Sequence, residues 1–295
     1  MGGASGDPWP APAKLNLFLH VLGRRPDGYH ELQTAYQIID LADEIWFDTR
    51  HDGQVIRVEG PFEVPAFDDL TVQAARRLLK EQKTSRPLGV SIHLRKRIPL
   101  DSGLGGGSSD AATTLVALNA LWGLGLSVER LADIALDLGA DVPVFVRGRS
   151  AWAEGIGERL TPIELPEMAY IVIHPGVGVS TREIFQAPEL TRNSDPITIR
   201  AFLESDVGND CEPVVRARYP QVAAALDWLS GYAPAQLTGT GSCVFAPVHD
   251  FKRAERLVSE VPAGWQGFLV QGRNRSPLLE RLERAGSAAS GRTRR

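Results

Sequence analysis

Cysteine is scarce in this sequence, which contains 295 residues and only two thiols, Cys211 and Cys243. Two distant cysteines form neither a disulfide framework nor the close spacing typical of a zinc site. The six histidines are also scattered along the chain. We therefore expect no metal site built by the protein alone, and a reducing, cytoplasmic location.

Long apolar runs and a large excess of one charge are also missing. The segment 15–22 is too short and too polar to span a bilayer, and residues 1–8 contain no basic segment followed by an apolar one. The formal net charge is −4, which leaves no basic footprint for nucleic acid. The sequence thus excludes membrane and nucleic-acid partners and favours small ligands bound in a local site.

Hydrophobic residues make up 43% of the chain, which is enough for a large core in one large or two ordinary domains. Composition changes near residues 155–160, just before two prolines, and we place a boundary there. The predicted organisation is a first domain at 11–157, a second domain at 158–284, and flexible tails at 1–10 and 285–295.

Hydrophobic periodicity predicts alternating strands and helices. Strands are expected at 13–21, 29–34, 38–47, 90–96, 142–145, 170–175 and 268–271. Helices are expected at 69–80, 111–122, 128–138, from Ser180 onward, and near 197–205, 212–230 and 250–261. On the first strand Lys14 and Asn16 share one face, because side chains alternate along a strand.

A glycine-rich loop over residues 99–110 separates a predicted strand from the helix expected at 111–122, which Ser109 or Asp110 would cap. Glycine lacks Cβ, so backbone N–H groups can close around an anion, and a helix N-terminus favours negative charge. Walker A is excluded because the loop has no lysine, and the Rossmann fingerprint fails at Ser108. The loop is thus either a phosphate cradle or a turn without a ligand.

Two further features stay open on the residues alone. Asp141 lies between a predicted helix and the strand at 142–145, where it could be a functional carboxylate or an ordinary turn residue. A second glycine cluster at 237–245 could form a ligand-facing loop or a hairpin with a bulge.

Three segments together resemble the three motifs of the GHMP kinases: 12–17, 103–110 and 239–242, in the same order and with similar spacing. The strings at 25–32 and 139–145 further resemble the members that act on 4-diphosphocytidyl-2-C-methyl-D-erythritol. The resemblance covers residues 11 to about 275. It implies a two-domain α/β fold, with an N-terminal ATP-binding domain, a C-terminal domain of ferredoxin-like character, and the site in the cleft between them.

The resemblance implies transfer of the γ-phosphoryl group of ATP to the 2-hydroxyl of that substrate, in the methylerythritol phosphate route to isoprenoid precursors. Asp141 would be the general base, and Lys14 would hold Asp141 ionised and counter the charge on the transferred group. Mg²⁺ is implied together with ATP, although no carboxylate is assigned to it.

The implied binding residues form two groups. The phosphate loop comprises Pro99, Leu100, Asp101, Ser102, Gly103, Leu104, Gly105, Gly106, Gly107, Ser108 and Ser109. The acceptor site comprises Asn16, Tyr29, His30, Thr181, Phe185, Gly239, Thr240 and Gly241, with Tyr29 and Phe185 stacking on the cytosine and His30 hydrogen-bonding its edge. Asp101 and Ser102 stand where the family more often has Gly or Ala.

Two alternative functions would share part of this sequence pattern. Another GHMP kinase for a small alcohol would share the glycine loop, but it should lack the strings at 25–32 and 139–145. A ligand sensor on the same fold should have lost Lys14 or Asp141, and both are present.

Overall fold

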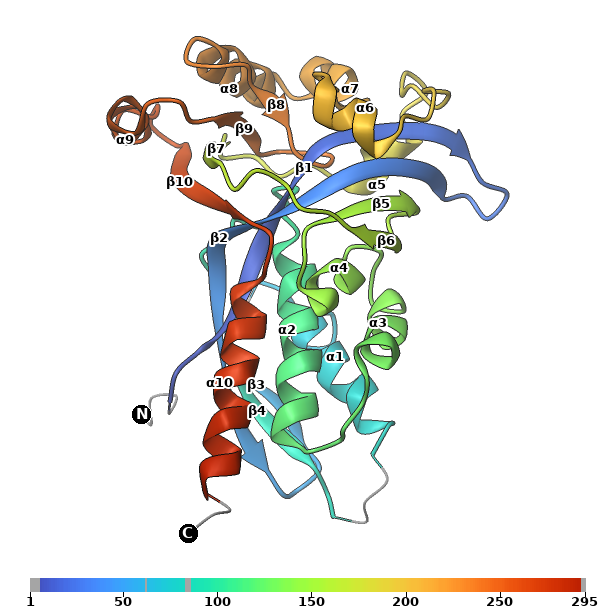
Figure 1. The fold of residues 1–295 in the computed structure, drawn as a ribbon, viewed down its shortest axis with the longest axis vertical. Coiled ribbons are helices and arrows are strands. Elements are labelled where there is room, and N and C mark those ends of the chain that lie inside the picture. Colours follow the sequence, from blue (N-terminus) through green and yellow to red (C-terminus); the bar gives the residue numbers. More distant parts are fainter. Residues whose placement is uncertain (1–5, 62, 83–85, 293–295) are drawn as a thin grey trace.

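A mixed β-sheet runs through the molecule in the computed structural model, which describes residues 6–61, 63–82 and 86–292 (Figure 1). The strands are β1 (Trp9–Arg24), β2 (His30–Arg50), β3 (Val55–Glu59), β4 (Gly89–Arg95), β5 (Ala151–Gly155), β6 (Arg159–Pro162), β7 (Ala169–His174), β8 (Gln236–Leu237), β9 (Val244–Pro247) and β10 (Gln266–Arg273). The helices are α1 (Leu70–Leu79), α2 (Gly106–Leu121), α3 (Val128–Leu136), α4 (Val142–Arg147), α5 (Thr181–Gln186), α6 (Ile199–Glu204), α7 (Glu212–Arg218), α8 (Pro220–Ser230), α9 (Phe251–Ser259) and α10 (Pro277–Arg292).

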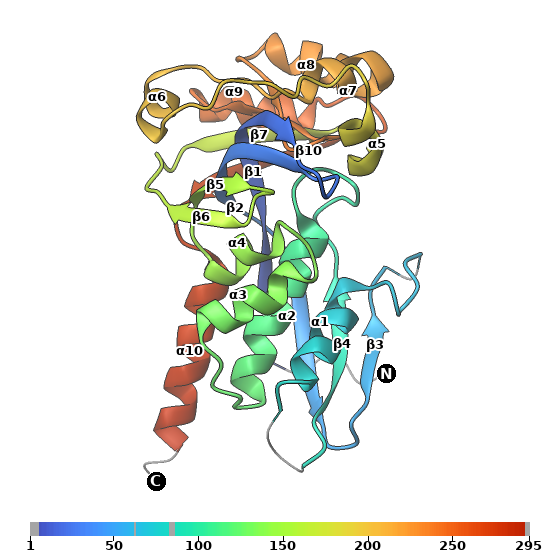
Figure 2. The same cartoon turned by 90° about the vertical axis from the view of Figure 1, so that its right-hand side faces the viewer.

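Strand β2 organises the sheet. Its 21 residues pair antiparallel with β1, β4, β5 and β10. Because β10 also pairs with β7, the strand order is β3-β4-β2-β10-β7-β9-β8. The sheet therefore continues from the first half of the chain into the second, and Figure 2 shows α6, α7 and α8 gathered at the end where β7 and β10 lie.

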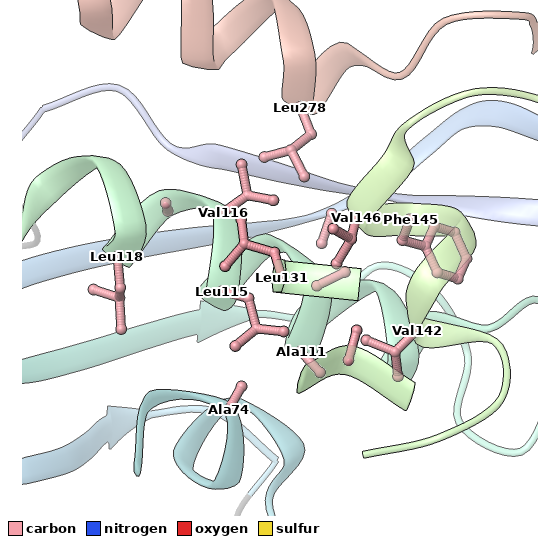
Figure 3. Close-up of a cluster of buried hydrophobic side chains, with 14 of the residues drawn as sticks. Ala74, Ala111, Leu115, Val116, Leu118, Leu131, Val142, Phe145, Val146 and Leu278 are labelled. Carbon is pink, nitrogen blue, oxygen red and sulfur yellow. The ribbon is translucent and has the colours of Figure 1, made fainter. Parts of the chain in front are cut away.

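The core of the first half surrounds α2. This helix is apolar on almost every side, as expected for a helix buried on all faces. Figure 3 shows Leu115 and Val116 of α2 between Ala74 of α1 and Leu278 of α10. The apolar packing holds α2 rigidly, and with it the loop from which the helix begins.

Hydrophobic periodicity predicted several elements correctly. Helices α1 and α3 begin after Asp69 and Ser127, whose side chains accept backbone N–H bonds from their first turns, and α5 begins after Ser180 in the same way. The strands at 90–96, 170–175 and 268–271 correspond to β4, β7 and β10. Among the described residues, no helix combines the length and the apolar character needed to cross a membrane.

Two local predictions beside the site are wrong. The segment expected as a strand at 142–145 is helix α4, since Pro143 stands in the first turn, where a missing N–H costs nothing. Helix α2 begins at Gly106, not after Ser109 or Asp110, and its N-cap is Gly105, with a left-handed φ of 74° and no side-chain cap. The last glycines of the loop are therefore the first turn of the helix.

The predicted tails also need correction. Strand β1 begins at Trp9, which is 3% exposed and lies under the guanidinium of Arg281 at 4.6 Å. Helix α10 continues through Ala285 to Arg292, because its apolar side packs on the core of the first half. Residues 1–5 and 293–295 lie outside the described residues. The predicted boundary at 157/158 falls between the paired strands β5 and β6 and stays a prediction.

Candidate active site

A cleft of about 820 Å³ opens where the two halves of the chain meet, within the size range of small-molecule sites. Its walls come from β1, the first part of β2 and the turn between them, from Lys96 and the loop at 99–108, from the starts of α1, α4 and α5, from the turn between β5 and β6, and from the second glycine cluster. Most of the predicted residues line it: Lys14, Asn16, Tyr29, His30, Pro99, Leu100, Asp101, Ser102, Gly103, Gly105, Gly106, Gly107, Ser108, Asp141, Thr181, Phe185, Gly239 and Thr240.

The two glycine clusters pack directly against each other. Gly103 has a φ of 76°, and a Cβ there would lie 2.3 Å from the carbonyl oxygen of Thr238 and 2.9 Å from that of Gly241. Gly105 has a φ of 74°, and a Cβ there would lie 2.9 Å from the ring of Phe145. Only glycine fits both positions. The second cluster therefore supports the loop as well as facing the cleft.

Three predicted residues do not line the cleft. Leu104 is buried in the core, Ser109 is fully buried inside α2, and Gly241 is packed against Leu237. The residues that do face the cleft at this point are Gly106, Gly107 and Ser108, the first turn of the 16-residue helix α2. The unpaired N–H groups of such a turn form a ready site for an anion.

Lys14 and Asp141 are brought together, although they are far apart in the sequence. The Nζ of Lys14 lies 3.5 Å from Oδ2 of Asp141. It donates one hydrogen bond of 2.8 Å to the carbonyl oxygen of Gly103 and another to Oδ1 of Asn16. Lys14 is 3% exposed, whereas the side chain of Asp141 is 33% exposed and faces the cleft. The pair thus combines a buried cation with an accessible carboxylate.

Tyr36 completes this cluster, and sequence reasoning missed it. Its hydroxyl donates a 2.9 Å hydrogen bond to Oδ1 of Asp141, and its ring lies 5.5 Å from Lys14 Nζ. Tyr36 stands opposite Asn16 in the register of β1 and β2. Its position depends on that pairing, which leaves no signal in the local sequence.

Burial dominates the electrostatics of the cluster. It lowers the pKa of Lys14, and Asp141 opposes this effect by favouring the ammonium form. Burial and the neighbouring Asp141 raise the pKa of Tyr36 well above its usual range, so the phenol stays protonated and remains a donor. Asp141 therefore has one neutral donor and one cation beside it, each on a different oxygen.

A second lysine cluster stands on the other side of the glycine loop. Lys96 Nζ lies 2.5 Å from Oδ2 of Asp43 and 2.7 Å from Oδ2 of Asp110, and Asp43 also accepts the backbone N–H of Ile98 at 2.8 Å. Burial raises the pKa of Asp110 to about 8; Lys96 opposes this and Asp43 adds to it. The cluster joins β2, the end of β4 and the first turns of α2. We expected Asp110 as a cap and missed both of its partners.

The end of the cleft beside the β1–β2 turn contains an aromatic stack. His30 and Phe185 are stacked with ring centroids 5.1 Å apart and 25° between the planes, and the exposed Tyr29 precedes His30 at the cleft edge. The hydroxyls of Thr181 and Thr240 lie 2.9 Å apart, which joins α5 to the second glycine cluster. Phe185 thus lies at the site instead of serving only as core packing.

The described residues contain no group of three or more His, Cys, Asp or Glu placed to hold a metal ion. The oxygen donors at the loop are single side chains, such as the hydroxyl of Ser108.

Family comparisons define the class of the protein. The model of the GHMP kinases N terminal domain matches residues 69–149, and the model of the GHMP kinases C terminal domain matches residues 187–267. The cleft is lined by residues of both matched regions and by residues of β1 and β2, which precede the first region. The fold is thus that of a GHMP kinase, a class that uses ATP.

Full-length relatives narrow the class. The chain is 59% identical to 4-diphosphocytidyl-2-C-methyl-D-erythritol kinase of Alkalilimnicola ehrlichii, over 93% of this chain and 94% of the relative. It is 54% identical to the protein of the same name from Nitrosococcus oceani, over 94% and 99%. The chain belongs to the 4-diphosphocytidyl-2-C-methyl-D-erythritol kinase family.

Solved structures of related proteins support the same family assignment. A crystal structure of 4-(cytidine 5'-diphospho)-2C-methyl-D-erythritol kinase matches with a TM-score of 0.77 and 34% identity, over 90% of this chain and 98% of that one. A mevalonate kinase matches with a TM-score of 0.67 and 15% identity, over 92% and 100%, which shows the shared fold alone.

Proposed function

We propose that this chain transfers the γ-phosphoryl group of ATP to the 2-hydroxyl of 4-diphosphocytidyl-2-C-methyl-D-erythritol, a step of the methylerythritol phosphate route to isoprenoid precursors. The observation that carries the proposal is the Lys14–Asp141 pair, 3.5 Å apart, between a glycine cradle and an aromatic stack in one cleft. The names and high identity of the relatives support the choice of substrate.

The phosphates of ATP bind at the start of α2. The N–H groups of Gly106, Gly107 and Ser108 are at the end of a helix whose body is held in the core, so they need no rearrangement to meet an anion. Lys96 lines the same part of the cleft, but it is paired there with Asp43 and Asp110 and holds the base of the loop. Leu104 and Ser109, buried beneath this surface, support the loop instead of contacting the nucleotide.

Magnesium fits this site as an ion carried with the nucleotide. When bound, Mg²⁺ would neutralise negative charge on the phosphates of the nucleotide. It usually keeps several waters and needs few protein ligands. The hydroxyl of Ser108, an oxygen donor in the first turn of α2, is the group of this chain that would hold it, directly or through water.

Asp141 removes the proton of the acceptor hydroxyl as the phosphoryl group transfers. A tertiary alcohol is a poor nucleophile, and a positioned base contributes about 10²–10⁴-fold to the rate. The hydroxyl of Tyr36 fixes one oxygen of the carboxylate and leaves the other toward Lys14 and the cleft. Lys14 stabilises the ionised carboxylate and the charge on the transferring group.

The cytidine end of the substrate binds at Tyr29, His30 and Phe185. Aromatic stacking supplies affinity of about 1–3 kcal/mol per base without choosing among bases. The choice comes from hydrogen bonds to His30. Asn16, Thr181, Gly239 and Thr240 contact the rest of the acceptor, whereas Gly241 acts through the packing of the loop.

A phosphoryl-transfer assay tests the proposal. The purified chain with ATP and Mg²⁺ should phosphorylate 4-diphosphocytidyl-2-C-methyl-D-erythritol and leave mevalonate, homoserine and galactose unchanged. Turnover of one of these other alcohols in place of the cytidine compound would make it a different GHMP kinase. Binding of both substrates without turnover would make it a sensor.

Tyr29→Ala tests the acceptor end. The variant should raise KM for the cytidine substrate by about tenfold, because one stacking face is lost, while KM for ATP stays within about twofold. Phe251→Ala is the matched control, since Phe251 is a similarly exposed aromatic residue on α9 outside the cleft. An equal rise of both KM values would contradict the placement of the base.

A further inference from the structure

We infer that Arg192 is a positioning residue for the acceptor base: it fixes the tautomer of His30 and anchors the helix that carries Phe185, so that the cleft offers a cytosine a hydrogen-bond donor. This inference rests on the proposed function for the identity of the base, but not for the state of His30.

Arg192 reaches His30 from a segment with no regular secondary structure between α5 and α6. Its Nε donates a 3.1 Å hydrogen bond to Nε2 of His30. Its Nη2 donates to the carbonyl oxygens of Phe185 at 2.9 Å and Ala187 at 2.6 Å, and its Nη1 donates to that of Leu190 at 3.0 Å. One guanidinium thus ties the end of α5 to the first residue of β2.

These contacts determine the form of the imidazole. Arginine has only N–H donors, so the ring nitrogen that it meets must be an acceptor. Nε2 of His30 is therefore unprotonated, and the neutral ring carries its proton on Nδ1. A doubly protonated ring would place two N–H groups against each other, which excludes the imidazolium while this contact exists.

The surroundings of His30 act in the same direction. Burial lowers the pKa of His30, and the positive charges of Arg192 and Arg24 lower it further. The ring is 8% exposed and lines the cleft. With Nε2 occupied, the imidazole has a donor to offer a ligand and no free acceptor.

A donor suits the acceptor atoms of cytosine, N3 and O2. The same guanidinium also sets the position of Phe185, whose ring stacks on His30. Arg192 therefore positions both residues that would contact the base, Phe185 by stacking and His30 by hydrogen bonding, although Arg192 does not line the cleft itself. Lysine cannot replace it, because an ammonium lacks the planar fork that reaches the imidazole and the carbonyls together.

The direct test is ¹⁵N NMR of the histidine rings in the free, full-length protein at neutral pH. His30→Gln identifies the His30 signals by their loss. In the wild-type protein His30 should carry its proton on Nδ1, and in Arg192→Met the Nε2-protonated form should become prominent. Arg218→Met is the control, because Arg218 holds the same segment through Glu189 without touching His30.

Kinetics test the consequence for the substrate. Arg192→Met should raise KM for the cytidine substrate about tenfold, the equivalent of one lost hydrogen bond, with kcat and KM for ATP within about twofold. Arg192→Lys should not restore the low KM. In the His30→Gln background, Arg192→Met should add less than about twofold, because coupled residues are not additive.

Each outcome decides the inference. An Nε2-protonated His30 in the wild-type protein would overturn it, even if every Arg192 variant failed to fold. A changed tautomer with an unchanged KM for the cytidine substrate would overturn the role in recognition. Failure of the proposed function has a different signature: a wild-type protein that does not phosphorylate the cytidine compound, with the effect of Arg192 on His30 intact.

Discussion

A buried lysine, Lys14, and a partly buried one, Lys96, flank the glycine loop, and they differ in what surrounds them. Lys96 has two carboxylates within 2.7 Å, and both of these are almost completely buried. Lys14 has one carboxylate, at 3.5 Å, and that carboxylate is one-third exposed. The pKa of Lys96 is raised, although burial alone would lower it, whereas the pKa of Lys14 is lowered.

The difference agrees with the proposed roles, in which Lys96 belongs to a structural ion cluster and Lys14 to a reactive one. Lys96 is bound from two sides and joins three elements at the base of the loop, so its charge is used within the fold. Lys14 and Asp141 are less completely matched, and the carboxylate retains access to the cleft. A group that must exchange a proton or meet changing charge needs this incomplete matching. The four predictions below test this contrast, from the largest expected effect to the smallest.

Lys96→Met should lower the free energy of unfolding by about 3–5 kcal/mol, because it leaves Asp43 and Asp110 buried together without a cation. Urea denaturation measures the change, and Lys252→Met on the exposed side of α9 is the control. Unchanged stability would remove the structural half of the contrast.

Asp141→Asn should lower kcat by at least about 10²-fold, because the amide cannot accept the proton of the acceptor hydroxyl. ATP binding, followed by calorimetry, should persist. Asp133→Asn, on the exposed face of α3, should leave kcat unchanged. Near-normal turnover of Asp141→Asn would refute its role as the base.

Asp110→Asn should change how stability depends on pH. The pKa of Asp110 is about 8 in the folded protein and 3.8 without its surroundings. The folded state therefore holds a proton that the unfolded state loses, and this contribution to wild-type stability disappears as pH rises from about 4 to 8. The difference in unfolding free energy, variant minus wild type, should therefore rise across this pH range by at least about 1.4 kcal/mol, which is the equivalent of a shift of one pKa unit. A constant difference would mean that Asp110 is ionised throughout.

Tyr36→Phe should lower kcat about fivefold to tenfold, since the carboxylate of Asp141 loses one neutral hydrogen bond worth about 1 kcal/mol. The ring stays to fill its site. Both KM values should remain within about twofold in steady-state kinetics. A loss as large as that of Asp141→Asn would mean that Tyr36 itself takes part in proton transfer.

Local rules explain which parts of the fold could be predicted. Asp69, Ser127 and Ser180 cap helices through bonds to nearby residues, so the sequence around them is sufficient. The residues at 142–145 have the composition of a strand, but they form α4, with Pro143 in its first turn and contacts to α2 and α3 that are distant in sequence from any local signal. The start of α2 was misplaced because its cap is a glycine backbone without a side-chain signal.

The residues of the site also divide into those that the local sequence identifies and those that it does not. Lys14, Asp141 and the glycine loop stand in contiguous motifs that a family resemblance identifies. Tyr36 and Arg192 act through contacts between distant segments, Tyr36 from the middle of β2 and Arg192 from an irregular segment. Nothing in their own neighbourhoods marks them, because their roles arise only when strands pair and the two halves of the chain meet.

The C-terminal helix α10 packs on the core of the first half of the chain, which has a consequence for folding during synthesis. Leu278 belongs to the same core as α2, and Leu282 and Ala285 pack against it, so the helix that begins at the glycine loop is not fully covered until this part of α10 has left the ribosome. The first half of the chain emerges earlier and must wait with part of its apolar surface open. A chain that stops before residue 278 would therefore leave part of this apolar core exposed to solvent.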